Sequence, residues 1–146
     1  STAASTTSNV GNYTITSAAN NLSATNYQFN YVNGSLAISK ATLTVTADNK
    51  SKVYGNTNPS LTYTITGYKN SDTSSVVTGA PTISTTATTT SNVDSYPITV
   101  AANTLAATNY QFSYANGSLT ITQAPLTITG ATTSVTYNGS AQTDRN

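Results

Sequence analysis

Apolar residues alternate with small polar residues over several short segments of the chain. Leu43 and Val45 are each flanked by threonines, and Leu61, Tyr63 and Ile65 follow the same period of two. Such alternation is typical of β-strands that turn one face inward and the other face to solvent. On this basis we expect strands at residues 41–48, 61–68, 82–88, 95–100, 110–114 and 118–122.

One short segment departs from this period. Residues 71–77, SDTSSVV, are expected to form a single helical turn that Asp72 caps and that ends before Gly79. One turn is too short to be stable without packing. Residues 55–60, GNTNPS, are typical of a turn between strands. The predicted fold class is therefore all-β, with at most this one short helix.

The chain repeats itself, because the segment Ser8–Thr46 recurs as Ser91–Thr129. Of the 39 aligned positions in the two segments, 26 are identical, far more than a Thr-rich composition produces by chance. A repeat unit of this length indicates a tandem array of small domains. We place unit boundaries before Ala41 and Ala124, because Pro125 suits the first residue of a strand. The expected organisation is the second half of one module at 1–40, a complete module at 41–123 and the first strands of another at 124–146.

The closest match within the repeat contains an Asn-Gly pair. The segment reads NYQFNYVNGSLAIS at residues 26–39 and NYQFSYANGSLTIT at residues 109–122. Because Asn-Gly is the strongest short-range signal for a two-residue type I′ hairpin, we expect hairpin turns at Asn33-Gly34 and Asn116-Gly117. In that register one face of the first hairpin is apolar and expected to be buried, and it carries Tyr27, Phe29, Tyr31, Leu36 and Ile38.

These segments resemble a known family of repeats. ATLTVTADNKSKVYGNTNPSLTYTITG, SSVVTGAPTIS, SYPITV and NYQFSYANGSLTIT are similar to the MBG modules of large bacterial surface adhesins, in the subtype with a Tyr-Gly signature, here Tyr54-Gly55. The resemblance implies a mostly β fold and an extracellular or bacterial cell-surface location. It also implies a role in stalk or presentation segments, and it brings no catalytic residues. The third repeat departs from the signature, with Tyr137-Asn138-Gly139 in place of Tyr-Gly.

Composition narrows the chemistry. The chain has no His and no Cys, its only acids are four aspartates, and its formal net charge is +1. We therefore expect no catalytic residue, no cofactor and no nucleic acid partner, since titratable groups are few and no basic patch exists. Asp72 with Asn70 and Ser71 is the one cluster considered for a cation, but a cation needs several converging oxygen ligands. Capping is the favoured interpretation of this cluster, and no metal site is predicted.

Two functions from different classes fit these observations. The favoured one is a structural stalk or matrix repeat of an extracellular bacterial adhesin or fibre, which spaces or assembles without catalysis. The alternative is a glycan-binding module, because tyrosine rings stack on sugars and asparagine side chains hydrogen-bond to their hydroxyl groups. Tyr68, beside Gly67 and Lys69 in a loop, is the candidate for ligand contact.

The expected architecture is a series of small two-layer modules, either Ig-like sandwiches or β-grasp-like, joined by short linkers. No stretch approaches the roughly 18 apolar residues of a membrane helix, so membrane insertion is not expected. The half-modules at 1–40 and 124–146 need partners for their cores. We expect neighbouring modules or copies of the same chain to supply them, by completing the ends or by pairing along edge strands.

Overall fold

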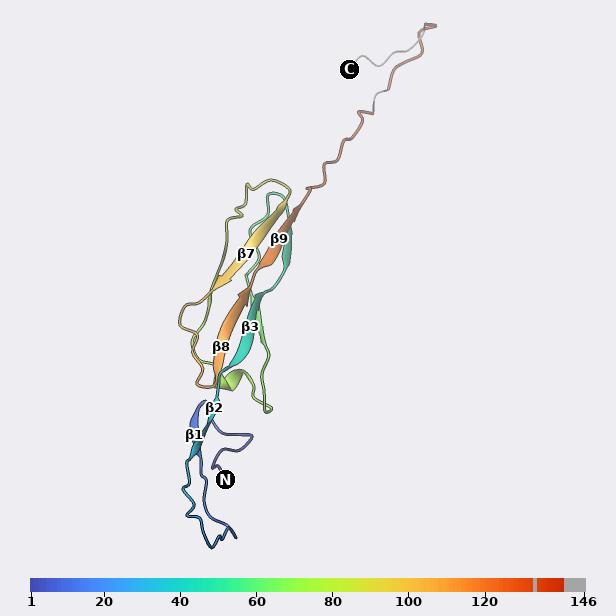
Figure 1. Ribbon diagram of the computed structural model, residues 1–146. Helices are drawn as coiled ribbons and strands as arrows, with labels where there is room; N and C mark the ends of the chain where they lie inside the picture. Colours follow the sequence, from blue (N-terminus) through green and yellow to red (C-terminus); the bar gives the residue numbers. More distant parts are fainter. Residues whose placement is uncertain (133, 141–146) are drawn as a thin grey trace.

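The computed structural model describes residues 1–132 and 134–140. Within them lie three parts in line: the β1–β2 pair near the N-terminus, a sandwich built from β3 to β9, and an extended segment after β9 (Figure 1). The elements are β1 (Gly11–Ile15), β2 (Gly34–Ile38), β3 (Ala41–Ala47), β4 (Lys50–Val53), β5 (Tyr63–Thr66), the 3-10 turn η1 (Ser74–Val76), β6 (Thr82–Thr85), β7 (Ser95–Ala101), β8 (Tyr110–Ala115) and β9 (Gly117–Thr122).

Strands β3 to β9 form two sheets that pack face to face. One sheet has the strand order β5-β3-β8 and the other has the order β4-β9-β7-β6. Side chains from both sheets meet in one buried core, among them Val45 and Ala47 from β3, Ile98 from β7, and Leu119 and Ile121 from β9. The all-β fold and its two layers are confirmed. The second layer is a sheet rather than a helix, which favours the sandwich over the β-grasp alternative.

The first and last strands of the sandwich lie side by side in both sheets. β3 pairs with β8 in parallel, with Leu43 opposite Phe112, and β4 pairs with β9 in parallel, with Lys52 opposite Ile121. β8 lies at the edge of its sheet, so within residues 1–132 and 134–140 its one strand neighbour there is β3. The strand at 110–115, near the end of the module, therefore depends on pairing with β3, which lies at the start of the module.

The predicted hairpins are wrong. β8 and β9 belong to different sheets, and neither Asn116 nor Gly117 has the positive φ angle that a type I′ turn requires. At this point the chain crosses from one layer to the other. Asn116 Oδ1 accepts a hydrogen bond from the backbone N–H of Val100 at 3.2 Å, and a Cβ at Gly117 would collide with the carbonyl oxygen of Ala47. The Asn-Gly pair thus marks a crossing held by an asparagine side chain and a close backbone approach.

The same correction applies to the first copy. Asn33 Oδ1 accepts from the backbone N–H of Ser17 at 3.1 Å, which matches the Asn116–Val100 bond at the aligned positions of the second copy. Gly34 begins β2, which pairs with β1 and not with residues 26–32. Neither Asn33 nor Gly34 has a positive φ angle, so this pair is not a type I′ hairpin turn either.

The face predicted to be buried is buried in only one of the two copies. Tyr110 is 3% exposed, and Phe112 and Leu119 also contribute to the core, although they come from opposite sheets. In the first copy Tyr27 is 80% exposed and residues 26–32 form no strand. No segment of the described chain pairs with residues 26–32 in the way that β3 pairs with β8.

The strand pairing of the repeat is nevertheless the same in both copies. Tyr13 of β1 lies opposite Leu36 of β2, and at the aligned positions Tyr96 of β7 lies opposite Leu119 of β9. Both pairs are antiparallel and keep one register. The β1–β2 pair is therefore the β7–β9 pair of a second unit, joined to the sandwich through the two residues between Ile38 and Ala41.

Two smaller predictions also change. The short helix exists as the 3-10 turn η1, but its cap is Thr73, whose side chain accepts from the backbone N–H of Ser75. Tyr63 was expected to point inward with Leu61 and Ile65; it is 36% exposed, while the other two pack against the core. In the part of the chain that the structure describes, no helix is long and apolar enough to span a membrane.

Candidate functional site

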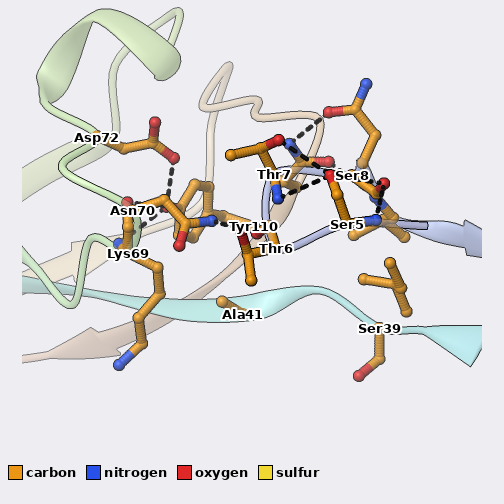
Figure 2. A pocket seen from close by; sticks show the side chains of 14 residues that line it. Ser5, Thr6, Thr7, Ser8, Ser39, Ala41, Lys69, Asn70, Asp72 and Tyr110 are labelled. Atoms are coloured by element: carbon orange, nitrogen blue, oxygen red, sulfur yellow. Dashed lines mark hydrogen bonds between the residues drawn. The ribbon is translucent and has the colours of Figure 1, made fainter.

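A polar cleft of about 550 Å³ opens where the N-terminal unit meets the sandwich (Figure 2). One wall is the loop Ser5–Val10, called the first loop below. The other wall is formed by the turn Lys69–Asp72 between β5 and η1 and by the start of β8. The cleft therefore lies at the junction between two repeats.

The turn Lys69–Asp72 is held by one tyrosine. Its two central residues, Asn70 and Ser71, have left-handed φ angles of 50° and 63°, and the N–H of Asp72 donates to the carbonyl of Lys69 at 2.8 Å. The hydroxyl of Tyr110 donates to Asp72 Oδ2 at 2.6 Å and accepts from the N–H of Lys69 at 3.0 Å. The hydrogen bond to Asp72, followed by burial, raises the pKa of Tyr110. Asp72 thus anchors the turn to β8 instead of capping η1.

The first loop is a compact turn closed by its own side chains. The N–H of Ser5 donates to Ser8 Oγ at 2.8 Å, and the N–H of Ser8 donates to the carbonyl of Ser5 at 3.2 Å. The hydroxyl of Tyr13 on β1 donates to the carbonyl of Asn9 at 2.8 Å. The loop is therefore fixed to the β1–β2 pair and presents a defined surface to the sandwich.

Between described residues, four hydrogen bonds cross the junction. Asn109 makes two of them, accepting from the N–H of Val10 at 3.0 Å and donating to Asn9 Oδ1 at 2.8 Å. Asn70 Nδ2 donates to the carbonyl of Thr6 at 3.2 Å. The fourth runs from the linker, where Lys40 Nζ donates to the carbonyl of Ala107 at 3.2 Å. Three of the four bonds join neutral groups, so the junction should respond weakly to salt.

The ligand candidate Tyr68 lies at a different place. It is half-buried, and its ring packs edge-on against Tyr110 with a centroid distance of 6.2 Å. Its exposed part lines a separate hollow of about 470 Å³ together with Tyr63 and Leu105. The structure therefore places Tyr68 and Tyr63 at one hollow that is separate from the cleft at the junction, although the ring of Tyr68 also contacts Tyr110, which lines that cleft.

Two charged residues are engaged in structural bonds that the sequence did not predict. Lys52 on β4 is only 7% exposed, and its Nζ donates to the carbonyls of Asn56 at 3.0 Å and Thr88 at 2.6 Å. Asp48 accepts hydrogen bonds from the hydroxyls of Thr62 and Thr64, which lower its pKa. Among the described residues, no three His, Cys, Asp or Glu side chains gather into a group that could hold a metal ion.

Sequence reasoning missed the junction because its residues carry no distinctive chemistry. Asn9, Asn70 and Asn109 are three of 17 asparagines, so none of them stands out by type. The usable signal was the repeat itself, since Asn9 and Val10 recur as Asn92 and Val93.

Comparison with known protein families gives a match over just more than half of the chain. The MBG domain of the YGX type matches residues 43–120, which is 78 of the 146 residues of the chain. No curated protein and no solved structure matches the chain. The matched span contains the described strands from β4 to β8, and it covers β3 from Leu43 onward and β9 as far as Thr120.

Proposed function

Because the chain belongs to the MBG domain family of the YGX type, we propose that it is a structural spacer repeat of an extracellular bacterial surface protein. In this role each repeat adds a fixed length to a stalk or matrix fibre and performs no reaction. Modules of this family are repeat modules of surface proteins, which supports the location and the spacing role.

The observation that carries the proposal is the junction between the two units. Among the described residues, three hydrogen bonds tie the first loop to the sandwich and a fourth comes from Lys40 in the linker, which has only two residues between β2 and β3. A linker this short leaves little freedom to reorient, and Figure 1 shows the two units one after the other along one axis. Units joined in this way are suited to building an extended rod.

The use of the charged groups supports a role without catalysis. Lys52, Asp48 and Asp72 each satisfy structural hydrogen bonds rather than facing a common cavity. General acid–base catalysis needs a titratable group within reach of a bound substrate. Asp72 and Tyr110, two of the titratable groups that line the junction cleft, are hydrogen-bonded to each other.

The spacing role is tested by lengthening the chain. One, two and three further copies of residues 41–123 are inserted between Gln123 and Ala124, and the products are imaged by electron microscopy. The proposal predicts rods whose contour length grows by the same increment with each added repeat. Globular particles whose longest dimension does not grow linearly would contradict it.

Glycan binding has one observation in its favour. Tyr63 and Tyr68 both line one hollow of about 470 Å³, so two tyrosines lie at a shared space on the surface. A glycan array with the full chain tests it, with Tyr63→Ala as the matched variant. Micromolar binding that the Tyr63→Ala variant loses would support this function, and no binding above that of the variant would reject it.

We also propose that copies of the chain complete each other's half-modules. Residues 124–130 align with β3 and residues 26–32 align with β8, and the β3–β8 register would place Leu126 of one copy opposite Phe29 of another. Leu126 is 87% exposed, while its counterpart Leu43 is fully buried. Sedimentation velocity should show association that increases with concentration and that Leu126→Asp abolishes. A chain that stays monomeric at millimolar concentration would refute completion between copies.

A further inference from the structure

We propose that the loop Thr88–Val93, called the second loop, is a docking surface for the repeat that follows the sandwich. Its partner would be the face on which the first loop rests, formed in this chain by Asn70, Ala107 and Asn109 and called the receiving face. The inference rests on the proposed function and adds the contact that would set the geometry of every junction in the array.

The second loop has the same internal structure as the first. In the first loop the N–H of Ser5 bonds to Ser8 Oγ at 2.8 Å, and in the second the N–H of Thr88 bonds to Ser91 Oγ at 2.8 Å. The return bond is also shared, from the N–H of Ser8 to the carbonyl of Ser5 at 3.2 Å and from Ser91 to Thr88 at 3.3 Å. The two turns are therefore closed in the same way.

Each loop is also held by a tyrosine on the strand that follows it, and the two tyrosines occupy aligned positions of the repeat. Tyr13 donates to the carbonyl of Asn9 at 2.8 Å, and Tyr96 donates to the carbonyl of Asn92 at 3.2 Å. The residue that follows the second loop lies beside β9, because the N–H of Ile121 donates to the carbonyl of Asp94 at 2.8 Å. The second loop thus stands at the end of the sandwich from which the chain leaves toward the next repeat.

The groups that bind the receiving face are all present in the second loop. The first loop uses the carbonyl of Thr6, the side chain of Asn9 and the N–H of Val10. The two loops read STTSNV and TTTSNV, so all three groups recur and the loops differ only at Ser5 and Thr88. This difference lies outside the three contacting groups.

The exposure of Val93 shows that the proposed docking surface is not covered in this chain. Val10 is partly buried against the sandwich, whereas Val93 is 48% exposed. Among the described residues, the N–H of Val93 has no hydrogen-bond partner corresponding to the Val10–Asn109 bond. A receiving face would cover Val93 and bind its N–H.

The sequence after β9 points to a further repeat as the occupant. Residues 124–129 continue the repeat, aligned with the residues that form β3. Gln123 occupies the place of Lys40, and its side-chain amide can also donate to a carbonyl, as Lys40 does to Ala107. The linker chemistry of the first junction can therefore be reproduced at the second.

Amide hydrogen exchange measured by NMR on the full chain tests the inference first. The N–H of Val10 should exchange roughly three- to tenfold more slowly than in an Asn109→Ala variant, the range expected for one lost hydrogen bond. Asn103→Ala, which changes an exposed loop asparagine, is the matched control and should leave Val10 unaffected. Ser5→Thr gives the first loop the sequence of the second, and it should keep the protection of Val10.

A lengthened chain then tests the second loop itself. One further copy of residues 41–123 is inserted after Gln123. In this lengthened chain the N–H of Val93 should exchange more slowly than in the original chain, by the factor measured for Val10. The effect should disappear when the inserted copy carries Asn109→Ala. Fast exchange of the Val93 N–H in a lengthened chain whose inserted strands are protected would overturn the inference. Loss of the protection of the Val10 N–H in the Ser5→Thr variant of the original chain would also overturn it. Linear growth of the rods with an unprotected Val93 would reject the docking contact while leaving the spacing role intact.

Discussion

The burial difference between matched leucines gives a quantitative test of the fold. Leu43 and Leu126 occupy the same position of the repeat, but Leu43 is fully buried on the inner face of β3 and Leu126 is 87% exposed. Replacing a buried leucine by alanine removes its apolar contacts and leaves a cavity, which costs about 2–5 kcal/mol. Substitution at an exposed site usually changes stability by less than about 0.5 kcal/mol. Leu43→Ala should therefore lower the free energy of unfolding by several kcal/mol, and Leu126→Ala should leave it nearly unchanged.

The assay must follow the sandwich alone, because the β1–β2 pair can unfold separately. NMR signals of amides in β7 during urea denaturation report on the sandwich, and linear extrapolation gives its free energy of unfolding. The measurement is made at low protein concentration so that association does not contribute. Equal losses of stability in the Leu43→Ala and Leu126→Ala variants would refute the reasoning, because they would mean that residues 124–130 are packed in the same way as β3.

Two further predictions follow from individual contacts. Gly117→Ala should destabilise the sandwich by about 1–3 kcal/mol in urea denaturation, since the new Cβ meets the carbonyl of Ala47, whereas Gly34→Ala meets only ordinary contacts and should not destabilise. Hydrogen bonds from Thr62 and Thr64 lower the pKa of Asp48 in the folded state, so its contribution to stability is present above its ordinary pKa and is lost as pH falls through the lowered value. Thermal unfolding at pH 7 and pH 3 should therefore show a smaller loss of Tm for Asp48→Asn than for the unchanged chain; an equal loss would contradict this.

Strands whose pattern reflects their own burial could be predicted from the sequence. The alternation around Leu43 and Val45 indicated β3, because its threonine face is partly wet and its apolar face fills the core. β4 could not be found in this way. It contains two lysines, and it forms because the buried stem of Lys52 allows its Nζ to reach two carbonyls contributed by other segments.

The Asn-Gly pairs show the limit of local turn signals. Asn116 and Gly117 have the composition of a tight hairpin, but the residues before and after them find better partners in different sheets. The glycine is needed because Ala47 lies too close for a Cβ, and Ala47 belongs to β3, far from Gly117 in sequence. A contact of that kind cannot be inferred from the pair and its neighbours.

The candidate site was harder to predict than the fold. The junction depends on asparagine side chains and backbone groups, which carry no charge pattern and no motif. Only the structure shows that the first loop and the receiving face meet, and only the repeat then indicates that the second loop can do the same. Apolar spacing predicts burial, whereas these polar contacts depend on how two units are placed relative to each other.

The central claim is that successive repeats are docked in one geometry, and residual dipolar couplings test it most directly. Small polar interfaces between domains usually allow relative motion, so independent units are the ordinary expectation. Backbone amide couplings from β1–β2 and from the sandwich, measured on the full chain, should fit one common alignment tensor. Couplings that require two different tensors, or that are scaled toward zero in β1–β2, would show that the units move independently and would contradict the account.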